Sequence, residues 1–225
     1  MKKNAKIFFV FSIFFYSMAL FGENEKNPGG TNKFDAGIFF GPGFSKGVLE
    51  SDKKKNFDEA DISGSFSIGV YFNYYINNQV SIFYGLGDTN KPVKYTNEIS
   101  SSTFPYNKQK KSYKSKNRYI NLPFGMRFYG DILFYGIGIY YADKYIGKSG
   151  FEDDYGFFVD FGIRFDLDFL REETEKNKTT SKDMKLLLFI RYEKGLADIY
   201  SGTNPDFGKI KNTALYFNIG ISNYF

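Results

Sequence analysis

The side chains that could do chemistry in this chain are charged groups, and the residue types most often used for catalysis are missing. There is no histidine and no cysteine among the 225 residues. Histidine is the usual base with a pKa near neutrality, and cysteine is a common nucleophile. No spacing suggests a Ser-Lys or paired-carboxylate site, so we expect neither enzymatic activity nor a bound cofactor.

The charged groups recur on one face of alternating segments. From Tyr155 to Phe169 every second residue is large and apolar, and four of the positions between them are Asp or Arg. Successive side chains of a strand point to opposite faces, so the charges share one face and the apolar groups the other. The candidate site consists of the charges on such polar faces, which are Arg127, Asp160, Arg164, Asp166, Lys185, Arg191 and Glu193.

The elements that position these charges are predicted to be long β-strands. Alternation is unbroken over the twelve residues 65–76, which exceeds the usual soluble strand of about 5–6 residues and approaches the roughly 9–11 of a tilted membrane strand. No convincing helix period appears, so the chain is predicted to be all-β. The eight expected strands are Asp35–Phe44, Ser65–Ile76, Val80–Leu86, Tyr119–Tyr129, Ile132–Ala142, Tyr155–Phe169, Met184–Glu193 and Thr213–Phe225.

The connections between these strands alternate in length. Short turns at Asn77-Asn78 and Gly130-Asp131 alternate with long polar segments, which is typical of membrane barrels with short periplasmic turns and long external loops. The long segments are Ser45–Ile62, Gly87–Arg118, Asp143–Asp154 and Lys194–Asn212. Leu170–Asp183 is long where a short turn is expected, so either that turn is extended or the strand count is off by one.

Composition favours the same class. Aromatic residues make up 21% of the chain, with 28 Phe and 19 Tyr, although the mean hydropathy is only −0.38. A transmembrane barrel reconciles these values, because only every second strand residue meets lipid and aromatic girdles mark the interfaces. The predicted fold is therefore a closed antiparallel transmembrane β-barrel of about eight strands in the bacterial outer membrane.

The N-terminus is predicted to be an export signal. Lys2, Lys3 and Lys6 precede an apolar stretch that ends in a small residue, the order used by secretory signals. We expect residues 1–22 to be a signal peptide cleaved after Gly22, with Ala19 as the second choice and an uncleaved anchor as the alternative. Residues 23–33 then form a linker and 34–225 the barrel. The mature charge of about +2 argues against nucleic acid as a partner.

The C-terminal strand carries a possible assembly signal. Counting back by twos from Phe225 gives Ile221, Ile219 and Phe217, with Asn223 as the one polar exception. A terminal aromatic residue on an alternating apolar strand looks like the signal that outer-membrane proteins present to the barrel-assembly machinery. A chance edge strand is the alternative interpretation.

Three stretches carry a resemblance to a known family. They are the strand, turn and strand of Ile68–Gly87, the aromatic hairpin Arg118–Tyr141, and the last strand ending at Phe225. In these the chain resembles the porin-like small outer-membrane proteins, with barrels of the OmpA and OmpX type. The resemblance implies fold and location, and says little about activity.

Three functions remain open at this stage. The first is a structural or surface-interaction role, adhesin-like, with the lumen plugged by paired charges and with loops that contact host molecules or glycolipid headgroups. The second is a narrow porin-like channel for ions or small solutes. The third is an exported soluble carrier of the lipocalin type, with its apolar face inward.

Two loop features could bind ligands. The acidic clusters Asp58–Asp61 and Glu152–Asp154 offer oxygen atoms for Ca²⁺ but lack a calcium-loop pattern, so solvated loops are the preferred interpretation. The basic segment Lys91–Arg118 could grip an anionic headgroup or polyanion, although a basic girdle at the lipid interface explains it more simply.

The assignment of faces gives a direct test. Phe161→Arg, on the expected lipid face, should lower the free energy of unfolding by about 2–4 kcal/mol if it lies near the midplane. Asp160→Asn, on the expected lumen face, should disturb charge pairing without blocking insertion. Urea unfolding of the refolded barrel measures both, and equal tolerance at the two positions would contradict the assigned faces.

Overall fold

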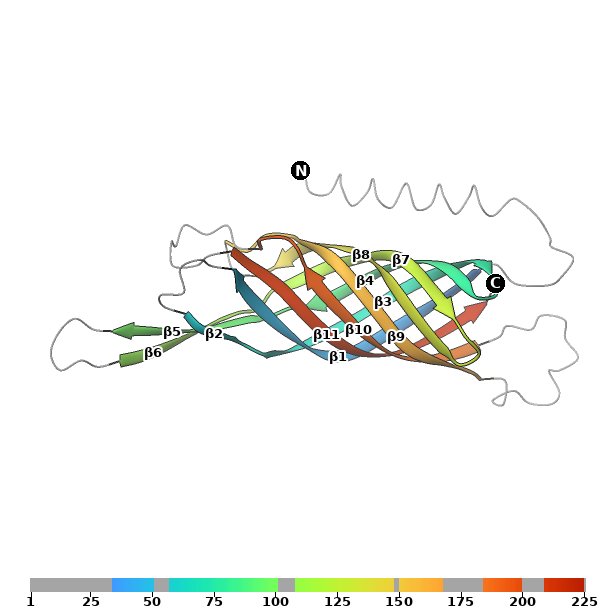
Figure 1. Ribbon diagram of the computed structural model, residues 1–225, viewed down its shortest axis with the longest axis horizontal. Helices are drawn as coiled ribbons and strands as arrows, with labels where there is room; N and C mark the ends of the chain where they lie inside the picture. Colours follow the sequence, from blue (N-terminus) through green and yellow to red (C-terminus); the bar gives the residue numbers. More distant parts are fainter. Residues whose placement is uncertain are drawn as a thin grey trace, which may run out of the picture. The chain divides into compact units, whose positions relative to one another are not determined.

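Eight strands close into an antiparallel barrel. The computed structural model describes residues 34–50, 57–100, 108–147, 150–167, 184–199 and 209–224. Within these ranges the barrel order is β1-β11-β10-β9-β8-β7-β4-β3 (Figure 1). The strands are β1 (Phe34–Glu50), β3 (Ser63–Asn77), β4 (Val80–Asn90), β7 (Arg118–Tyr129), β8 (Leu133–Ile146), β9 (Asp154–Asp166), β10 (Met184–Gly195) and β11 (Lys209–Tyr224). The predicted all-β class and the closed barrel of about eight strands are confirmed.

The barrel closes where its first strand meets its last. β1 pairs with β11 from Asp35↔Tyr224 to Glu50↔Lys209, so neither strand is left with a free edge. The register omits Gly41 and Pro42, and a proline has no N–H to donate to a ladder. On its other side β1 pairs with β3, and there Pro42 lies opposite Phe66.

Both described chain ends lie at one end of the barrel. Asp35 is opposite Tyr224 on one side and Asn73 on the other, close to the tight turn in which the side chain of Asn77 accepts the N–H groups of Gln79 and Val80. We call this the turn end, and the opposite end, which holds Lys91 and Asp154, the loop end.

The long connection that the sequence left ambiguous joins two neighbouring strands. β9 and β10 are antiparallel neighbours, paired from Lys185↔Asp166 to Gly195↔Gly156. Leu170–Asp183 therefore joins adjacent strands at the turn end, and the count of eight barrel strands holds. Residues 168–183 themselves lie outside the described ranges, as do the predicted signal peptide, the linker up to residue 33 and Phe225.

Two segments that the sequence assigned to loops contain further strands. Ser45–Ile62 holds the end of β1 and β2 (Phe57–Asp61), and Gly87–Arg118 holds β5 (Val93–Ser100) and β6 (Lys108–Ser115). These form a three-stranded sheet of order β2-β5-β6, which we call the tongue. The loop interpretation was wrong because these strands are short and mostly polar, while their pairing continues that of barrel strands: Asn90↔Arg118 is followed by Val93↔Ser115.

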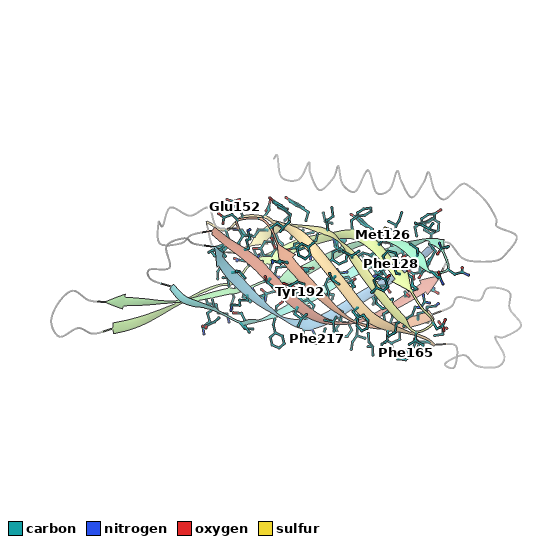
Figure 2. All side chains as sticks on the ribbon, viewed as in Figure 1. Met126, Phe128, Glu152, Phe165, Tyr192 and Phe217 are labelled. Carbon is teal, nitrogen blue, oxygen red and sulfur yellow. The ribbon has the colours of Figure 1, made fainter. Side chains whose placement is uncertain are left out.

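The two faces of the barrel wall have opposite chemistry. Ile139 and Phe161 are 64% and 56% exposed on the outside, whereas Phe158 and Asp160, on the inward face of β9, have no exposed surface. Figure 2 shows the outward side chains covering the wall, with Met126, Phe165, Tyr192 and Phe217 among them. An apolar outside and a filled, partly charged inside form the architecture of a transmembrane barrel.

Glycines on the inner wall make room for aromatic rings. A Cβ added to Gly138 would lie 2.7 Å from the ring of Phe158, and one added to Gly69 would lie 2.9 Å from the ring of Phe39. Gly37 stands in the same relation to Tyr71, at 2.6 Å. An eight-stranded lumen is only wide enough for side chains to fill it, so each ring needs a wall position with no side chain opposite.

This packing predicts a difference between two glycines. Gly138→Ala should lower the free energy of unfolding by about 1–3 kcal/mol, the usual cost of overpacking a filled core, because the new methyl meets both the Phe158 ring and the backbone of Phe124. Gly64→Ala is the matched control, since no heavy atom lies within 4 Å of its added Cβ, and should change stability by less than about 0.5 kcal/mol. Urea titration of the refolded protein measures both, and equal effects would rule out the glycine–ring account.

Candidate functional site: the barrel lumen

The middle of the lumen is blocked by one carboxylate held between two arginines. Arg191 donates from Nε to Asp160 Oδ1 at 2.7 Å and from Nη2 to Oδ2 at 2.8 Å. Arg127 donates from Nη2 to Oδ2 at 3.0 Å. The three residues come from β10, β9 and β7, so the cluster ties three strands together across the barrel interior. We call these three residues the charge plug.

Aromatic rings surround the charge plug. The guanidinium carbon of Arg127 lies 3.9 Å from the centre of the Phe83 ring, and that of Arg191 lies 4.5 Å from the Phe158 ring. Cations are attracted to ring faces, most strongly where water is excluded. Phe83 and Phe158 also pack edge to face, with ring centres 5.9 Å apart. The rings therefore stabilise the charge that Asp160 alone does not neutralise.

A second charged cluster lies at the loop end. Lys91 Nζ is 2.8 Å from Glu193 Oε2 and 3.2 Å from Asp154 Oδ2, and all three side chains are buried. The ammonium also sits 4.2 Å from the centre of the Tyr140 ring, whose hydroxyl donates to Asp154. Asn121 donates to Glu193 at 2.8 Å. This cluster, the lysine latch, carries two negative charges against one positive charge.

A third cluster of polar side chains lies in the lumen at the turn end. Asp35 accepts hydrogen bonds from Asn73 Nδ2 at 2.6 Å and from the Tyr75 hydroxyl at 2.8 Å. Arg164 lies over the Tyr129 ring, 4.6 Å from its centre. Counting Asp35 and Arg164 with the charge plug and the lysine latch, the formal charges sum to zero. The excess positive charge of the plug is thus balanced by the excess negative charge of the latch.

The residues predicted from the sequence do not all share the interior. Arg127, Asp160, Arg191 and Glu193 are buried in the lumen, and Arg164 is partly exposed. Asp166 is 63% exposed and pairs with Lys185 at 3.3 Å, so the prediction that Asp166 lies inside the barrel was wrong. Asp166 is the last residue of β9. The strand has passed the rim of the barrel there, so a side chain on its inward face no longer lies in the lumen.

Sequence reasoning missed three residues of the lumen. Lys91 and Asp154 were assigned to external loops, and Asp35 was not singled out, yet all three are buried. The signal that could have found Asp154 was present: the alternation that places Asp160 inward also places residues 158, 156 and 154 inward. The alternation of β4 likewise places residues 81, 83, 85, 87 and 89 inward, and continuing it by one step past the end of the strand places Lys91 inward too.

The acidic cluster Glu152–Asp154 does not assemble a metal site, and the side chains of Asp58 and Glu59 in the other cluster lie outside those that the structure describes. Asp154 points into the lumen, whereas Asp153 accepts the Tyr141 hydroxyl and the backbone N–H of Lys144, and Glu152 is exposed. Among the described residues no group of three or more His, Cys, Asp or Glu side chains is placed to hold a metal ion. No helix within the described ranges is long and apolar enough to cross a membrane.

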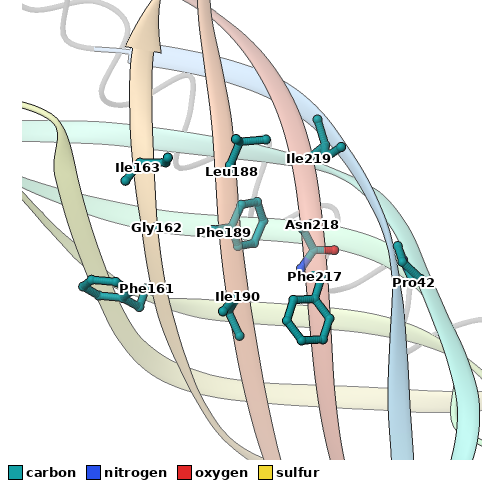
Figure 3. A pocket seen from close by; sticks show the side chains of 10 residues that line it. All are labelled: Pro42, Phe161, Gly162, Ile163, Leu188, Phe189, Ile190, Phe217, Asn218 and Ile219. Atoms are coloured by element: carbon teal, nitrogen blue, oxygen red, sulfur yellow. The ribbon is translucent and has the colours of Figure 1, made fainter.

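The outer wall carries an apolar groove of about 440 Å³ over β9, β10 and β11 (Figure 3). Phe161, Ile190 and Phe217 form one side, and Ile163, Leu188 and Ile219 lie beside them, with Pro42 of β1 at the edge. The groove lies within the apolar belt and beside the interruption of the β1–β11 pairing. It therefore belongs to the lipid-facing surface and not to the polar lumen.

Comparison with known proteins yields matches in solved structures alone. No family model and no curated protein matches the sequence. The structure of the outer membrane protein OprG from Pseudomonas aeruginosa is 14% identical, with 87% of this chain and 98% of that chain covered and a TM-score of 0.46. Ail of Yersinia pestis, in complex with the heparin analogue sucrose octasulfate, is 11% identical, with 84% and 99% covered and a TM-score of 0.37. Neisserial surface protein A is 13% identical, with 86% and 97% covered and a TM-score of 0.36.

The protein is a small outer-membrane β-barrel of eight barrel strands, as predicted. Its own architecture establishes this class: the sheet is closed, its outer face is apolar and its charges lie inside or at the rims. Closed antiparallel barrels of this kind, with an even number of strands, are characteristic of the bacterial outer membrane.

The lysine latch gives a measurable consequence. Lys91→Met should lower the free energy of unfolding by about 3–5 kcal/mol, because it leaves two buried carboxylates without their cation. The control is Lys46→Met on the outside of β1, an exposed lysine whose loss should change stability by less than about 0.5 kcal/mol. Urea unfolding in one detergent compares them. A Lys91 effect no larger than the Lys46 effect would mean that the latch does not hold the loop end.

Proposed function

We propose that the protein is a non-enzymatic, non-conducting barrel that acts at the cell surface through its loop end. The observation that carries this proposal is the filling of the middle of the lumen by the charge plug and its rings. Arg127 and Asp160 have no exposed surface, and Arg191 retains 3%. A water-filled path through the middle of the barrel would leave these groups exposed.

Opening such a path is energetically unfavourable. Asp160 would have to leave both arginines, and breaking one partner from a buried ion pair costs about 3–5 kcal/mol. Phe83 and Phe158, which pack on the two guanidinium groups, would also lose ring contacts. The lumen is thus a structural core that supports whatever the loop end displays.

The tongue supports a role at the surface. It extends the pairing of β3, β4 and β7 beyond the barrel strands themselves and carries the basic segment that the sequence marked as a possible site for glycolipid or host ligands. Two hydrogen bonds fix its base: the backbone N–H of Lys91 donates to the Asn117 carbonyl at 2.9 Å, and the side-chain hydroxyl of Ser45 donates to the Pro92 carbonyl at 2.8 Å.

A narrow channel is the second candidate, favoured by polar atoms in the loop-end half of the lumen. The side-chain oxygens of Ser63, Thr89 and Asn121 are buried there without a hydrogen-bond partner among the described residues. Buried polar groups are nearly always hydrogen-bonded, often to ordered water. Such water would hydrate the lumen as far as the charge plug. The carrier hypothesis requires the reverse of the observed arrangement, with an apolar interior.

Recordings in planar lipid bilayers test the proposal. The refolded wild-type protein should show no stepwise conductance in KCl, because the charge plug and its rings leave no aqueous path. Asp160→Ala together with Phe83→Ala is the positive control, since it removes the central carboxylate and the ring nearest to the Arg127 guanidinium. A gel shift between boiled and unboiled samples verifies that both proteins are folded. Reproducible steps from the wild type would overturn the plugged lumen and favour the channel.

A further inference from the structure

The outward face of β7 changes from apolar to basic where the chain comes from β6, without a break in the alternation. From residue 114 to residue 129, odd-numbered positions are buried and even-numbered positions are exposed or half-buried. The even positions, taken from the turn end upward, are Phe128, Met126, Phe124, Leu122, Ile120, Arg118, Lys116 and Lys114. A lipid-facing row of five apolar side chains therefore ends in three successive cations.

Two of these three cations, Lys114 and Lys116, are available to attract an anion. Arg118 forms an ion pair with Asp88 on the neighbouring strand β4, and Lys94 in the tongue pairs with Asp61 at 2.7 Å. Lys114 and Lys116 are exposed, and within the described ranges neither forms an ion pair. Lys114 lies directly opposite Lys94, whose charge is balanced by Asp61, so the ammonium group of Lys114 is left to attract an anion from outside the chain.

The position of the two lysines relative to lipid follows from strand geometry. Lys116 lies four residues beyond Ile120, about 14 Å along the strand at about 3.4 Å per residue. With a strand tilt of about 35–45°, the rise along the membrane normal is about 10 Å, and Lys114 is about 5 Å higher. A phospholipid headgroup layer is only about 5–8 Å thick on each side. The lysines thus stand at and above its outer edge, where the phosphates and sugars of a larger glycolipid headgroup lie.

Exposed aromatic residues mark the same interface on the adjacent strand. Tyr141 and Tyr145 of β8 point outward, and the Tyr145 ring lies 5.6 Å from the Arg118 guanidinium carbon. Tyrosine is enriched where apolar and polar layers of a membrane meet. Tyr141 and Tyr145 therefore place the boundary between the apolar and polar layers of the membrane just below Lys116.

We propose that Lys114 and Lys116, with Arg118 at their base, form a binding surface for the phosphate groups of an outer-leaflet glycolipid. This inference rests on the proposed surface role and identifies the partner as a membrane lipid. Two ammonium groups two residues apart on one face of a strand, about 7 Å along it, match a headgroup with more than one phosphate better than a single carboxylate. The ion pair with Asp88 on β4 holds the Arg118 side chain in place.

Native mass spectrometry of the refolded full chain in a neutral detergent tests this assignment. The probe is diphosphorylated lipid A, compared with the same lipid after removal of both phosphates. The wild type should bind the phosphorylated lipid at least tenfold more tightly than the dephosphorylated lipid. Lys114→Ser with Lys116→Ser should remove most of this preference. Lys46→Ser, a loss of an exposed lysine from the outer face of β1, should leave it unchanged.

Three results would overturn the assignment. One is an unchanged preference in the double variant, and another is an equal loss in the Lys46 variant. The third is binding of a soluble sulfated oligosaccharide with the same affinity and the same dependence on Lys114 and Lys116, which would indicate a soluble glycan as the partner. Boiled and unboiled gel mobility controls for folding. Conductance of the wild type would contradict the non-conducting proposal and leave this lipid preference untouched, so the two failures are distinguishable.

Discussion

The pairing of β1 with β11 is the constraint on which the rest of the structure depends. Within lipid no water is present to satisfy backbone N–H and C=O groups, so a sheet can cross only if it has no free edge. The register from Asp35↔Tyr224 to Glu50↔Lys209 removes both edges at once. Closure with eight strands then fixes the width of the lumen and, with it, the kind of side chains that can fill it.

In the lumen, the packing of the aromatic rings and the pairing of the charges support each other. Glycines at positions such as Gly138 and Gly69 accept the rings of Phe158 and Phe39, and the rings in turn cover the guanidinium groups of the charge plug. The surplus positive charge in the middle is offset by the lysine latch, whose Glu193 lies two residues from Arg191 on the same strand. A charged core can therefore be built in a narrow lumen without leaving a net charge.

The periodic part of the structure was predictable from the sequence, and the parts that depend on tertiary position were not. Alternation located all eight barrel strands and placed Arg127, Asp160, Arg191 and Glu193 on the inner face. It failed at the turn-end rim, where Asp166 is exposed. Asp154 and Lys91 continue the inward faces of β9 and β4 and were missed because both were assigned to loops. It also failed for the tongue, since a strand such as β6, with four lysines among its eight residues, shows no apolar face. That Lys91 meets Glu193 and Asp154 depends on which strands lie across the lumen.

The continuity between barrel and tongue has a mechanical consequence. β5 follows β4 after only two residues, and the ladder bonds of an antiparallel pair lie perpendicular to the strands. A pull on the tongue along its strands would load those bonds in shear, so that many of them share the force at once. The lysine latch adds an ionic anchor at the junction itself. A barrel built in this way can transmit traction from a bound surface to the membrane without unzipping.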